Sequence, residues 1–166
     1  MPAVPLDTKR YDPYLGYRFK VKFADSNNYV AAVTKMGALK RSTAPVVHRE
    51  GGDPSHERKS PGKSTFDAVT LERGVTQDRD FEKWANLVNS YKDDTTLKNF
   101  RKNVTVDLFN EQNQVVLSYH LLRCWVSEYT ALPALDAGNA AVAIESIKLE
   151  VEGWERDGGV KPPDEK

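Results

Sequence analysis

One segment of this chain has the hydrophobic period of an α-helix, and every other periodic segment has that of a β-strand. The helix is predicted over Asp80–Tyr91, because large apolar side chains recur there every three or four residues. These side chains are Phe81, Trp84, Val88 and Tyr91. The strand before the helix ends at the corner Arg73-Gly74, and Asp78 or Asp80 is expected to cap the first helical turn.

The strand segments alternate apolar and polar residues, which is typical of antiparallel sheets. The sequence therefore predicts a mainly β fold, an antiparallel β-barrel or sandwich of about seven strands with one α-helix. At 166 residues the chain has the length of one domain. We expect an N-terminal arm over residues 1–13, the β-barrel domain over 14–156 and a C-terminal tail over 157–166.

The first strand is predicted over residues 17–23, where apolar residues alternate with basic ones. Its inward side chains are expected to be Tyr17, Phe19, Val21 and Phe23. Its outer side, termed the basic face, carries Arg18, Lys20 and Lys22. Residues 25–28 have the composition of a turn, so residues 29–36 are expected to return as the second arm of a hairpin.

A clear hairpin is predicted from the strands 104–109 and 115–122, and the second of these is expected to continue through a kink. The last strand is predicted over residues 142–151. Its apolar residues change from even to odd positions near Ser146, which indicates a β-bulge there. Its polar face, which is mainly acidic, carries Lys148, Glu150 and Glu152.

Residues 37–64 form a long polar segment that glycine and proline interrupt, although residues 43–49 could be extended. The segment is predicted to be a long loop. Its centre contains Glu50, Gly51, Gly52 and Asp53. Such loops in compact domains are usually functional or disordered. If it is ordered, we expect it to contact another part of the chain or another subunit.

Two patterns in this segment resemble known sites but lack the required geometry. Residues 61–65 end like a phosphate-binding P-loop, but Glu57 stands where a glycine is required, and a strand follows instead of a helix. A turn is therefore predicted there. Metal-ligand residue types also cluster in the segment, at His48, Glu50, Asp53, His56 and Glu57. No regular element fixes their spacing, so no metal site is predicted.

The sequence contains no pattern typical of catalysis. The single cysteine, Cys124, lies in an apolar run and is predicted to be a buried, reduced thiol. His120 is expected to be a half-buried strand residue rather than a base. A Ser–His–Asp order with a nucleophile elbow and a reactive-cysteine context are both absent from the sequence. We therefore predict that the chain is not an enzyme and uses no cofactor.

The charges balance, with 24 basic and 24 acidic residues. This balance gives no global reason to expect nucleic acid or an anionic membrane as a partner. The basic face is also expected to lack the stacking aromatics of a nucleic-acid-binding barrel, because the aromatic residues of the same strand point inward. No signal peptide or transmembrane span is predicted, so we expect synthesis and assembly in a cytoplasm.

Several short motifs follow one another in a defined order along residues 14–156. They are Gly16-Tyr17-Arg18-Phe19, Gly62-Lys63, Thr70-Leu71-Glu72-Arg73-Gly74-Val75, Phe81-Glu82-Lys83-Trp84, Ile144-Glu145-Ser146-Ile147-Lys148-Leu149 and Glu152-Gly153. In this order and spacing the chain resembles the phage tail tube family, which includes T4-like tail tubes and the inner tubes of contractile injection systems. Within that pattern we expect Gly74, Phe81 and Trp84 to define the fold.

The resemblance implies subunits that close into hexameric rings and stack into a hollow tube, surrounded by a sheath and capped at a baseplate. The implied partners are further copies of the chain, a sheath protein, baseplate or tube-initiator proteins, and DNA or other cargo in the lumen; no membrane binding is expected. Two alternatives remain. One is a monomeric small-ligand-binding β-barrel, and the other, within the same class, is a type VI-like secreted ring protein or a tube-initiator subunit.

Two sets of residues are predicted to make contacts in such an assembly. The basic face is expected to meet the acidic residues Glu150 and Glu152, beside Lys148, either at a strand pairing or between subunits, because opposite charges attract across paired strands. The loop around Glu50, Gly51, Gly52 and Asp53 is expected to contact the adjacent ring.

Overall fold

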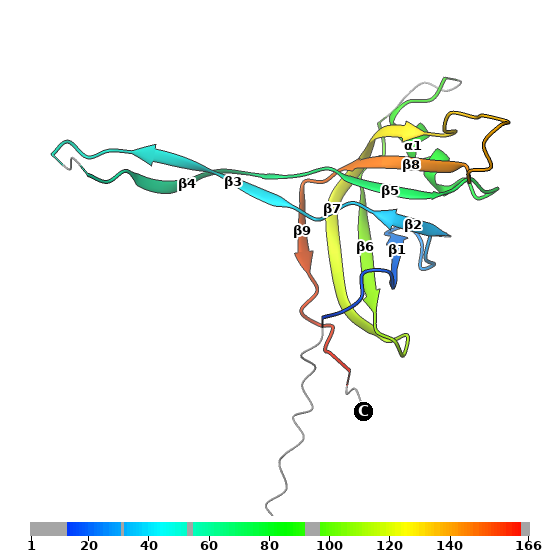
Figure 1. Ribbon diagram of the computed structural model, residues 1–166, viewed down its shortest axis with the longest axis horizontal. Coiled ribbons are helices and arrows are strands. Elements are labelled where there is room, and N and C mark those ends of the chain that lie inside the picture. Colours follow the sequence, from blue (N-terminus) through cyan, green and yellow to red (C-terminus); the bar gives the residue numbers. More distant parts are fainter. Residues whose placement is uncertain (1–12, 31, 53–54, 92–96, 164–166) are drawn as a thin grey trace, which may run out of the picture.

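The computed structural model describes residues 13–30, 32–52, 55–91 and 97–163 (Figure 1). The elements in chain order are β1 (Phe19–Phe23), β2 (Val33–Met36), β3 (Arg41–His48), β4 (Arg58–Phe66), β5 (Val69–Gly74), α1 (Asp80–Val88), β6 (Lys102–Phe109), β7 (Val115–Thr130), β8 (Ile144–Glu150) and β9 (Gly153–Arg156). Every strand pairing is antiparallel. The predicted mainly β, antiparallel fold with one helix is therefore confirmed.

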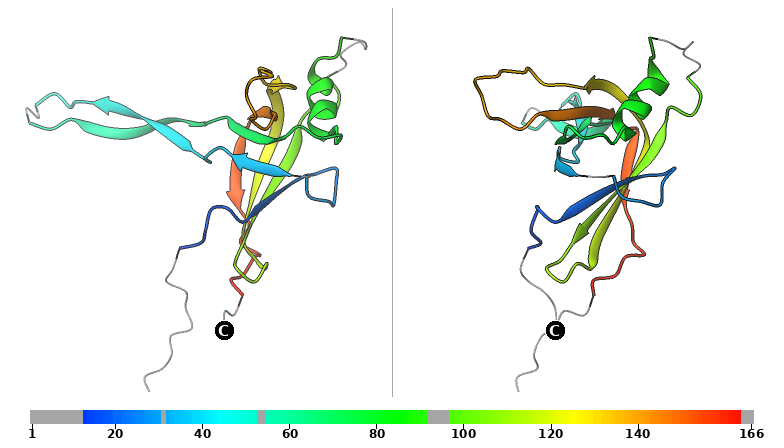
Figure 2. Two further views of the ribbon diagram at one scale, coloured as in Figure 1. Left: turned by 45° about the vertical axis from the view of Figure 1, so that its right-hand side comes forward. Right: turned by 90° about the vertical axis from the view of Figure 1, so that its right-hand side faces the viewer.

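The long strand β7 joins the two halves of the body. The strand order is β1-β6-β7-β8-β5-β2, and β9 also pairs with β7. The first half of β7 pairs with β6 and β9, and its second half pairs with β8. The strand path has two end strands, β1 and β2, so the sheet folds over as a sandwich and does not close into a barrel (Figure 2).

The bend between the two halves lies at Arg123. The register shifts between Lys102 and Val104 of β6, opposite Cys124 and Leu121, so that β7 contains one extra residue there. Arg123 has a φ of 52°, and Asn103 Oδ1 accepts its backbone N–H at 2.9 Å. A bulge of this kind bends a strand and increases its twist. The predicted hairpin of β6 and β7 and the kink after residue 122 are both confirmed.

The helix α1 closes one end of the core, as its period predicts. Phe81 and Trp84 are fully buried, and the Trp84 ring lies edge-on to Phe23 at a centroid distance of 4.6 Å. The helix ends at Val88, before the predicted end, and Tyr91 is fully exposed rather than part of the buried stripe. No side chain caps the N-terminus from Arg79; instead, Asp78 Oδ1 accepts the Asp80 N–H at 2.9 Å.

The predicted first hairpin is wrong. β1 pairs with β6, whereas β2 pairs with β5 in the other half of the body. Between the described residues of the two segments there is one backbone hydrogen bond, from the Val30 N–H to the Val21 carbonyl at 2.7 Å. Val30 is buried, so the chain turns into the core at this point before it crosses to the second half. Tyr17 is 67% exposed, which also corrects its predicted inward position.

Residues 37–64, predicted to be a loop, contain most of a two-stranded projection formed by β3 and β4, here termed the ribbon (Figure 1). Every residue of β3 is exposed, and so is every residue of β4 except Phe66. Pro61, Gly62 and Lys63 lie inside β4, so the turn predicted there is wrong as well. Because neither side of the ribbon is buried, its strands have no apolar alternation from which they could be recognised.

The bulge predicted near Ser146 is also wrong. β8 keeps an unbroken register with β5 from Ile144 to Leu149, and the irregularity lies in β7, between Val126 and Glu128. The odd-numbered residues of β8 face the core throughout, and Glu145 occupies one of these buried positions. A carboxylate at this core position interrupts the alternation of apolar and polar residues, so the sequence pattern resembles that of a bulge although the register is regular. Its partner is a buried arginine.

Candidate assembly interface

The base of the ribbon is joined to the body by backbone and charged contacts. The Gly37 N–H donates to the Thr70 carbonyl at 2.8 Å, and a Cβ at Gly37 would lie 3.2 Å from the Thr70 nitrogen. The Asp67 N–H donates to the Lys40 carbonyl at 3.0 Å, and the Lys40 ammonium lies 3.8 Å from the Asp67 carboxylate. These contacts fix the direction in which the ribbon leaves the sheet.

Aromatic rings strengthen the same junction. Phe66, at the end of β4, packs edge-on against Trp154 of β9 at a centroid distance of 5.9 Å. Trp154 packs in the same manner against Tyr119 of β7 at 6.0 Å, and the Arg41 guanidinium lies 6.0 Å from the centroid of the Trp154 ring. Gly153 lies beside the Phe66 ring, which would be 3.9 Å from a Cβ there. Two strands of the body, β7 and β9, thus hold the ribbon at its base.

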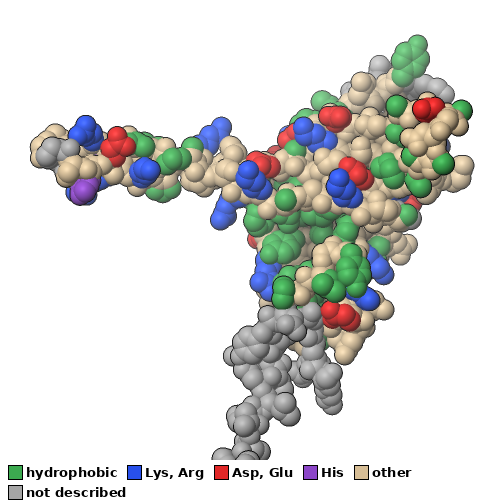
Figure 3. All heavy atoms as spheres, viewed as in Figure 1, with side chains coloured by type: hydrophobic (Ala, Val, Ile, Leu, Met, Phe, Trp, Pro, Cys, Tyr) green, Lys and Arg blue, Asp and Glu red, His purple; other side chains and the backbone are tan. Residues whose placement is uncertain are grey.

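Beyond its base, the ribbon is held by its own strand pairing. Gly62 faces the opposite strand so closely that a Cβ would lie 2.7 Å from the Ala44 carbonyl oxygen. The charged residues of its strands are all basic, and the space-filling view shows Lys and Arg side chains along the projection (Figure 3). They are Arg41, Arg58, Lys59 and Lys63. The ribbon is therefore an exposed and mainly cationic surface.

The tip of the ribbon contains three of the loop residues singled out from the sequence, Glu50, Gly51 and Gly52. Glu50 lies 3.8 Å from Arg58 in an exposed ion pair, and Gly52 has a φ of 106°, which favours glycine. Gly51 has open space around it. Asp53 lies outside the described residues. Across the described ranges, no group of three or more His, Cys, Asp or Glu side chains is placed to hold a metal ion.

The basic face lies on β1, at one end of the sheet. Contrary to the prediction, aromatic rings share this face: the Lys20 ammonium lies 5.3 Å from the centroid of Tyr29 and 5.2 Å from that of Phe109. Lys22 also lies over Tyr29, at 5.9 Å. Arg18 extends toward the turn between β6 and β7, where Nη1 donates to Asn113 Oδ1 at 3.3 Å.

Tyr29 is held over β6 by a strong hydrogen bond. Its hydroxyl donates to Asp107 Oδ2 at 2.7 Å, and Ser118 Oγ donates to Asp107 Oδ1 at 2.7 Å. Burial, together with the hydrogen bond and the negative charge of Asp107, raises the pKa of Tyr29 to about 12. Asp107 is buried, so these two donors satisfy a carboxylate that would otherwise lie unpaired in the sheet.

The acidic residues at the end of β8 lie in a different place. Ser127 Oγ donates to Glu150 Oε1 at 3.2 Å, and Glu152 lies 2.8 Å from the Arg123 Nε and 3.5 Å from the Arg101 Nε. β8 pairs with β5 and β7, whereas β1 pairs with β6. The two charged faces thus share no strand pairing within the described chain. Their contact between subunits stays a prediction, as does the role of Lys148.

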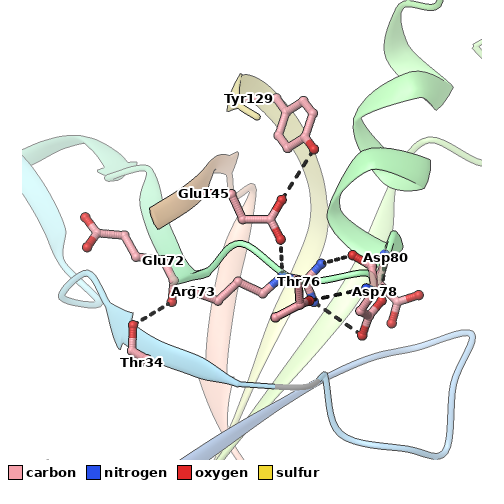
Figure 4. Close-up of polar contacts among 8 residues, drawn as sticks. All are labelled: Thr34, Glu72, Arg73, Thr76, Asp78, Asp80, Tyr129 and Glu145. Atoms are coloured by element: carbon pink, nitrogen blue, oxygen red, sulfur yellow. Dashed lines mark hydrogen bonds and ion pairs between the residues drawn. The ribbon is translucent and has the colours of Figure 1, made fainter. Parts of the chain in front are cut away.

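A buried arginine joins the neighbouring strands β5 and β8 to the start of α1 (Figure 4). Arg73, the last but one residue of β5, is fully buried and pairs through Nε with the Glu145 carboxylate. Its Nη2 donates to the Asp78 carbonyl at 2.8 Å, and its Nη1 lies 3.4 Å from the Asp78 carboxylate. The guanidinium also lies over the Phe81 ring, 4.2 Å from its centroid.

Tyr129 completes this group, here termed the Arg73 cluster: Arg73, Asp78, Glu145 and Tyr129. The Tyr129 hydroxyl lies 3.5 Å from Glu145 Oε2, and burial, followed by the negative charge of Glu145, raises the pKa of Tyr129. The contacts of Arg73 therefore give a structural role to the corner Arg73-Gly74, which the sequence places between the strand and the helix. The turn after Gly74 brings Asp78 back over the guanidinium, and α1 begins from there.

Three further predictions concern Cys124, His120 and membrane spans. Cys124 is buried, as predicted, and burial raises the pKa of its thiol to about 12. His120 lies in β7 and is partly exposed, between Thr105 Oγ1 at 3.1 Å and Asp157 Oδ2 at 3.2 Å. The helix within the described ranges is too short and too polar to span a bilayer.

The chain was compared with models of known protein families. The family model described as T4-like virus tail tube protein gp19 matches residues 15–155. The chain belongs to the T4-like tail tube protein family. The resemblance inferred from the sequence motifs is confirmed, and the chain is therefore a structural tube subunit by class. No curated protein sequence matches the chain.

Solved structures share the fold of this tail tube protein. A chain of the anti-feeding prophage (AFP) baseplate aligns with a TM-score of 0.73 and 22% identity, over 90% of this chain and 98% of that chain. A chain of the PVC extracellular contractile injection system, from the extended sheath–tube complex, aligns with a TM-score of 0.73 and 20% identity, over 90% and 94%. Hcp1 from Flavobacterium johnsoniae aligns at 0.53 and 12% identity, over 89% and 100%.

Proposed function

We propose that this protein assembles into stacked hexameric rings that form the hollow inner tube of a contractile phage tail or a phage-tail-like injection particle. DNA or another cargo passes through the lumen, and the subunit itself makes and breaks no bond. The family match over residues 15–155 carries this proposal. The proposed partners are further copies of the chain, a sheath protein outside, and baseplate or tube-initiator proteins at the end.

Open strand edges in the described fold support self-assembly. β9 pairs with β7 alone, and β2 pairs with β5 alone, so each strand has one edge without a strand partner. The outer edge of β1 is only partly covered, by the segment that contains Val30. Unpaired edges are a liability in a soluble monomer, and a closed ring of subunits covers them.

Opposite charges are a candidate for the contact between neighbours within a ring. The basic face Arg18, Lys20 and Lys22 of one subunit would meet Glu150 and Glu152 of the next. We expect Lys20→Glu and Glu150→Lys each to reduce assembly, and the double variant to restore part of it. Normal assembly of both single variants would exclude this contact.

The ribbon is the candidate for contact between rings, because it projects from the body and buries none of its own residues beyond Phe66. Deletion of residues 50–61 should abolish stacking while the subunit remains folded, as judged by circular dichroism. A normal tube after this deletion would contradict the assignment.

The packed interior argues against the alternative of a small-ligand-binding barrel. Large side chains fill the space between the sheets and α1. Four of them are no more than 1% exposed: Leu71, Phe81, Trp84 and Leu121. A ligand-binding barrel needs an internal cavity. The type VI-like ring protein and the tube-initiator subunit remain versions of the same structural proposal.

Negative-stain electron microscopy of the purified protein across a concentration series, combined with sedimentation velocity, tests the proposal. We expect rings at low concentration and stacked rings or hollow tubes at high concentration. A species that remains monomeric over the whole range would contradict self-assembly by this chain alone, and a ligand screen would then be the appropriate next step.

A further inference from the structure

The connection between β7 and β8, residues 131–143, is an exposed apolar loop. Asp136 is its single charged residue, in a chain in which 29% of the residues are charged. Leu132, Leu135 and Val142 are 59%, 72% and 76% exposed. Contiguous exposed apolar side chains of this kind mark an interaction surface in a soluble protein.

Hydrogen bonds hold this apolar loop in shape before any partner binds. Asp136 Oδ1 accepts the Gly138 N–H at 2.9 Å, and the Asp136 carbonyl accepts the Asn139 N–H at 3.1 Å. At the end of the loop, the Val75 N–H donates to the Ala143 carbonyl at 2.9 Å. A preformed surface loses less conformational entropy on binding than a flexible one does.

The ribbon carries the complementary surface. Val46 and Val47 are 52% and 49% exposed, although both lie in a strand. Val47 is directly opposite Lys59, so an apolar side chain and a cation stand side by side on one face of the ribbon. The apolar loop offers the matching pair, because Leu135 is followed by the acidic Asp136.

The two surfaces lie at opposite ends of the molecule. In Figure 1 the ribbon projects to the left, and the loop between β7 and β8 lies at the upper right. They therefore do not meet within one chain, but the ribbon of one copy is able to meet the loop of the next. A contact between two different surfaces of identical subunits is heterologous, so it repeats from copy to copy.

We propose that the ribbon of one copy docks on the apolar loop of a second copy, with Val47 and Lys59 against Leu135 and Asp136. This inference rests on the proposed function, since it requires a self-assembling subunit. It deepens that function by naming the surface that receives the ribbon.

Cross-linking between two single-cysteine variants tests the contact. Val47→Cys and Leu135→Cys are purified separately, mixed under conditions in which the unchanged protein assembles, and treated with a short bis-maleimide. The native Cys124 does not interfere, because it is buried and its thiol pKa is raised to about 12. We expect a cross-linked dimer from the mixture and none from either variant alone. Gln112→Cys, exposed on the turn between β6 and β7, is the control partner for Val47→Cys and should give no product.

The outcomes separate this inference from the function on which it rests. Rings or tubes without the Val47→Cys and Leu135→Cys product overturn the docking contact and leave the tube proposal intact. Absence of both assembly and product overturns both proposals. As a second test, Lys59→Glu should weaken assembly by about tenfold. Asp136→Asn in the same chain removes the repelling charge but keeps the Oδ1 acceptor for the Gly138 N–H, so it should restore part of the assembly. A double variant that assembles no better than Lys59→Glu contradicts the pairing of these two residues.

Discussion

The Arg73 cluster and the ribbon are built in opposite ways. Arg73 is fully buried, and its ion pairs and its contact with Phe81 join β5, β8 and the start of α1. The strands of the ribbon are exposed along their length and contact the body only at the base. We therefore propose that the body residues determine whether the subunit folds, whereas the ribbon residues determine how folded subunits assemble.

The sharpest test of the first half of this comparison is Arg73→Met. The substitution leaves the Glu145 carboxylate buried without its cation, and the loss of one partner of a buried ion pair costs about 3–5 kcal/mol of stability. Urea denaturation of the dilute protein measures this loss. Arg79→Met is the control, because its ion pair with Glu82 is exposed, so no measurable change is expected. Equal effects of the two substitutions would contradict a structural role of the cluster.

The junction of the two regions is tested by Trp154→Ala. Trp154 is partly buried between Phe66 and Tyr119, so its removal should cost about 2 kcal/mol, less than a full core truncation. It should also loosen the ribbon. Spin labels on cysteines introduced at Val46 and Gln112 report this change as a broader distance distribution.

Trp125→Ala is the matched control for Trp154→Ala. It removes a similar edge-on aromatic pair, with Phe100, away from the ribbon. The stability loss should be comparable, but the distance distribution should stay narrow. If both variants broaden the distribution equally, the aromatic junction does not orient the ribbon.

Gly62→Ala tests whether a change in the ribbon affects assembly without affecting stability. The new Cβ would lie 2.7 Å from the Ala44 carbonyl oxygen, so the two strands must move apart. Because the ribbon contributes little to the core, the free energy of unfolding should change by no more than about 0.5 kcal/mol. Assembly, measured by sedimentation, should fall by at least about tenfold. Gly51→Ala, with open space around the glycine, should assemble normally.

The smallest expected effect concerns the C-terminal end. The Gly159 N–H, at 2.8 Å, and then His120 lower the pKa of Asp157. A lowered folded-state pKa contributes stability above the unfolded pKa of about 3.9, and this contribution disappears as the pH falls through the folded value. Asp157→Asn should thus be slightly less stable than the unchanged protein at pH 7, and equally stable in strong acid. A difference independent of pH in urea denaturation would contradict this sign.

Several elements could be predicted from the sequence because one of their faces is buried. The period of α1, the hairpin of β6 and β7 and the kink in β7 all follow from apolar residues that face the core. Cys124 is buried for the same reason. Local patterning therefore located most of the body and also supported assignment to the family.

Other elements could not be predicted, because their determinants are not local. The strands of the ribbon have no buried face and hence no period, so they read as a loop. Glu145 lies at a core position because Arg73 neutralises it from another strand, and this buried charge led to the wrong prediction of a bulge near Ser146. The aromatic rings on the basic face come from Tyr29 and Phe109. Tyr29 lies beyond the end of β1 and Phe109 lies on β6, so neither is a strand neighbour of Lys20 in the sequence.

The sequence alone determined the strand-rich fold class, the single helix and the membership of the tail tube family, because apolar periodicity and short motifs are local properties of the chain. The tertiary structure decided which strands pair, where Glu145 finds its cation and how the ribbon leaves the body. These features depend on contacts between residues far apart in sequence. These contacts stabilise the protein only when the strands have come together, so no periodic pattern in the sequence predicts them.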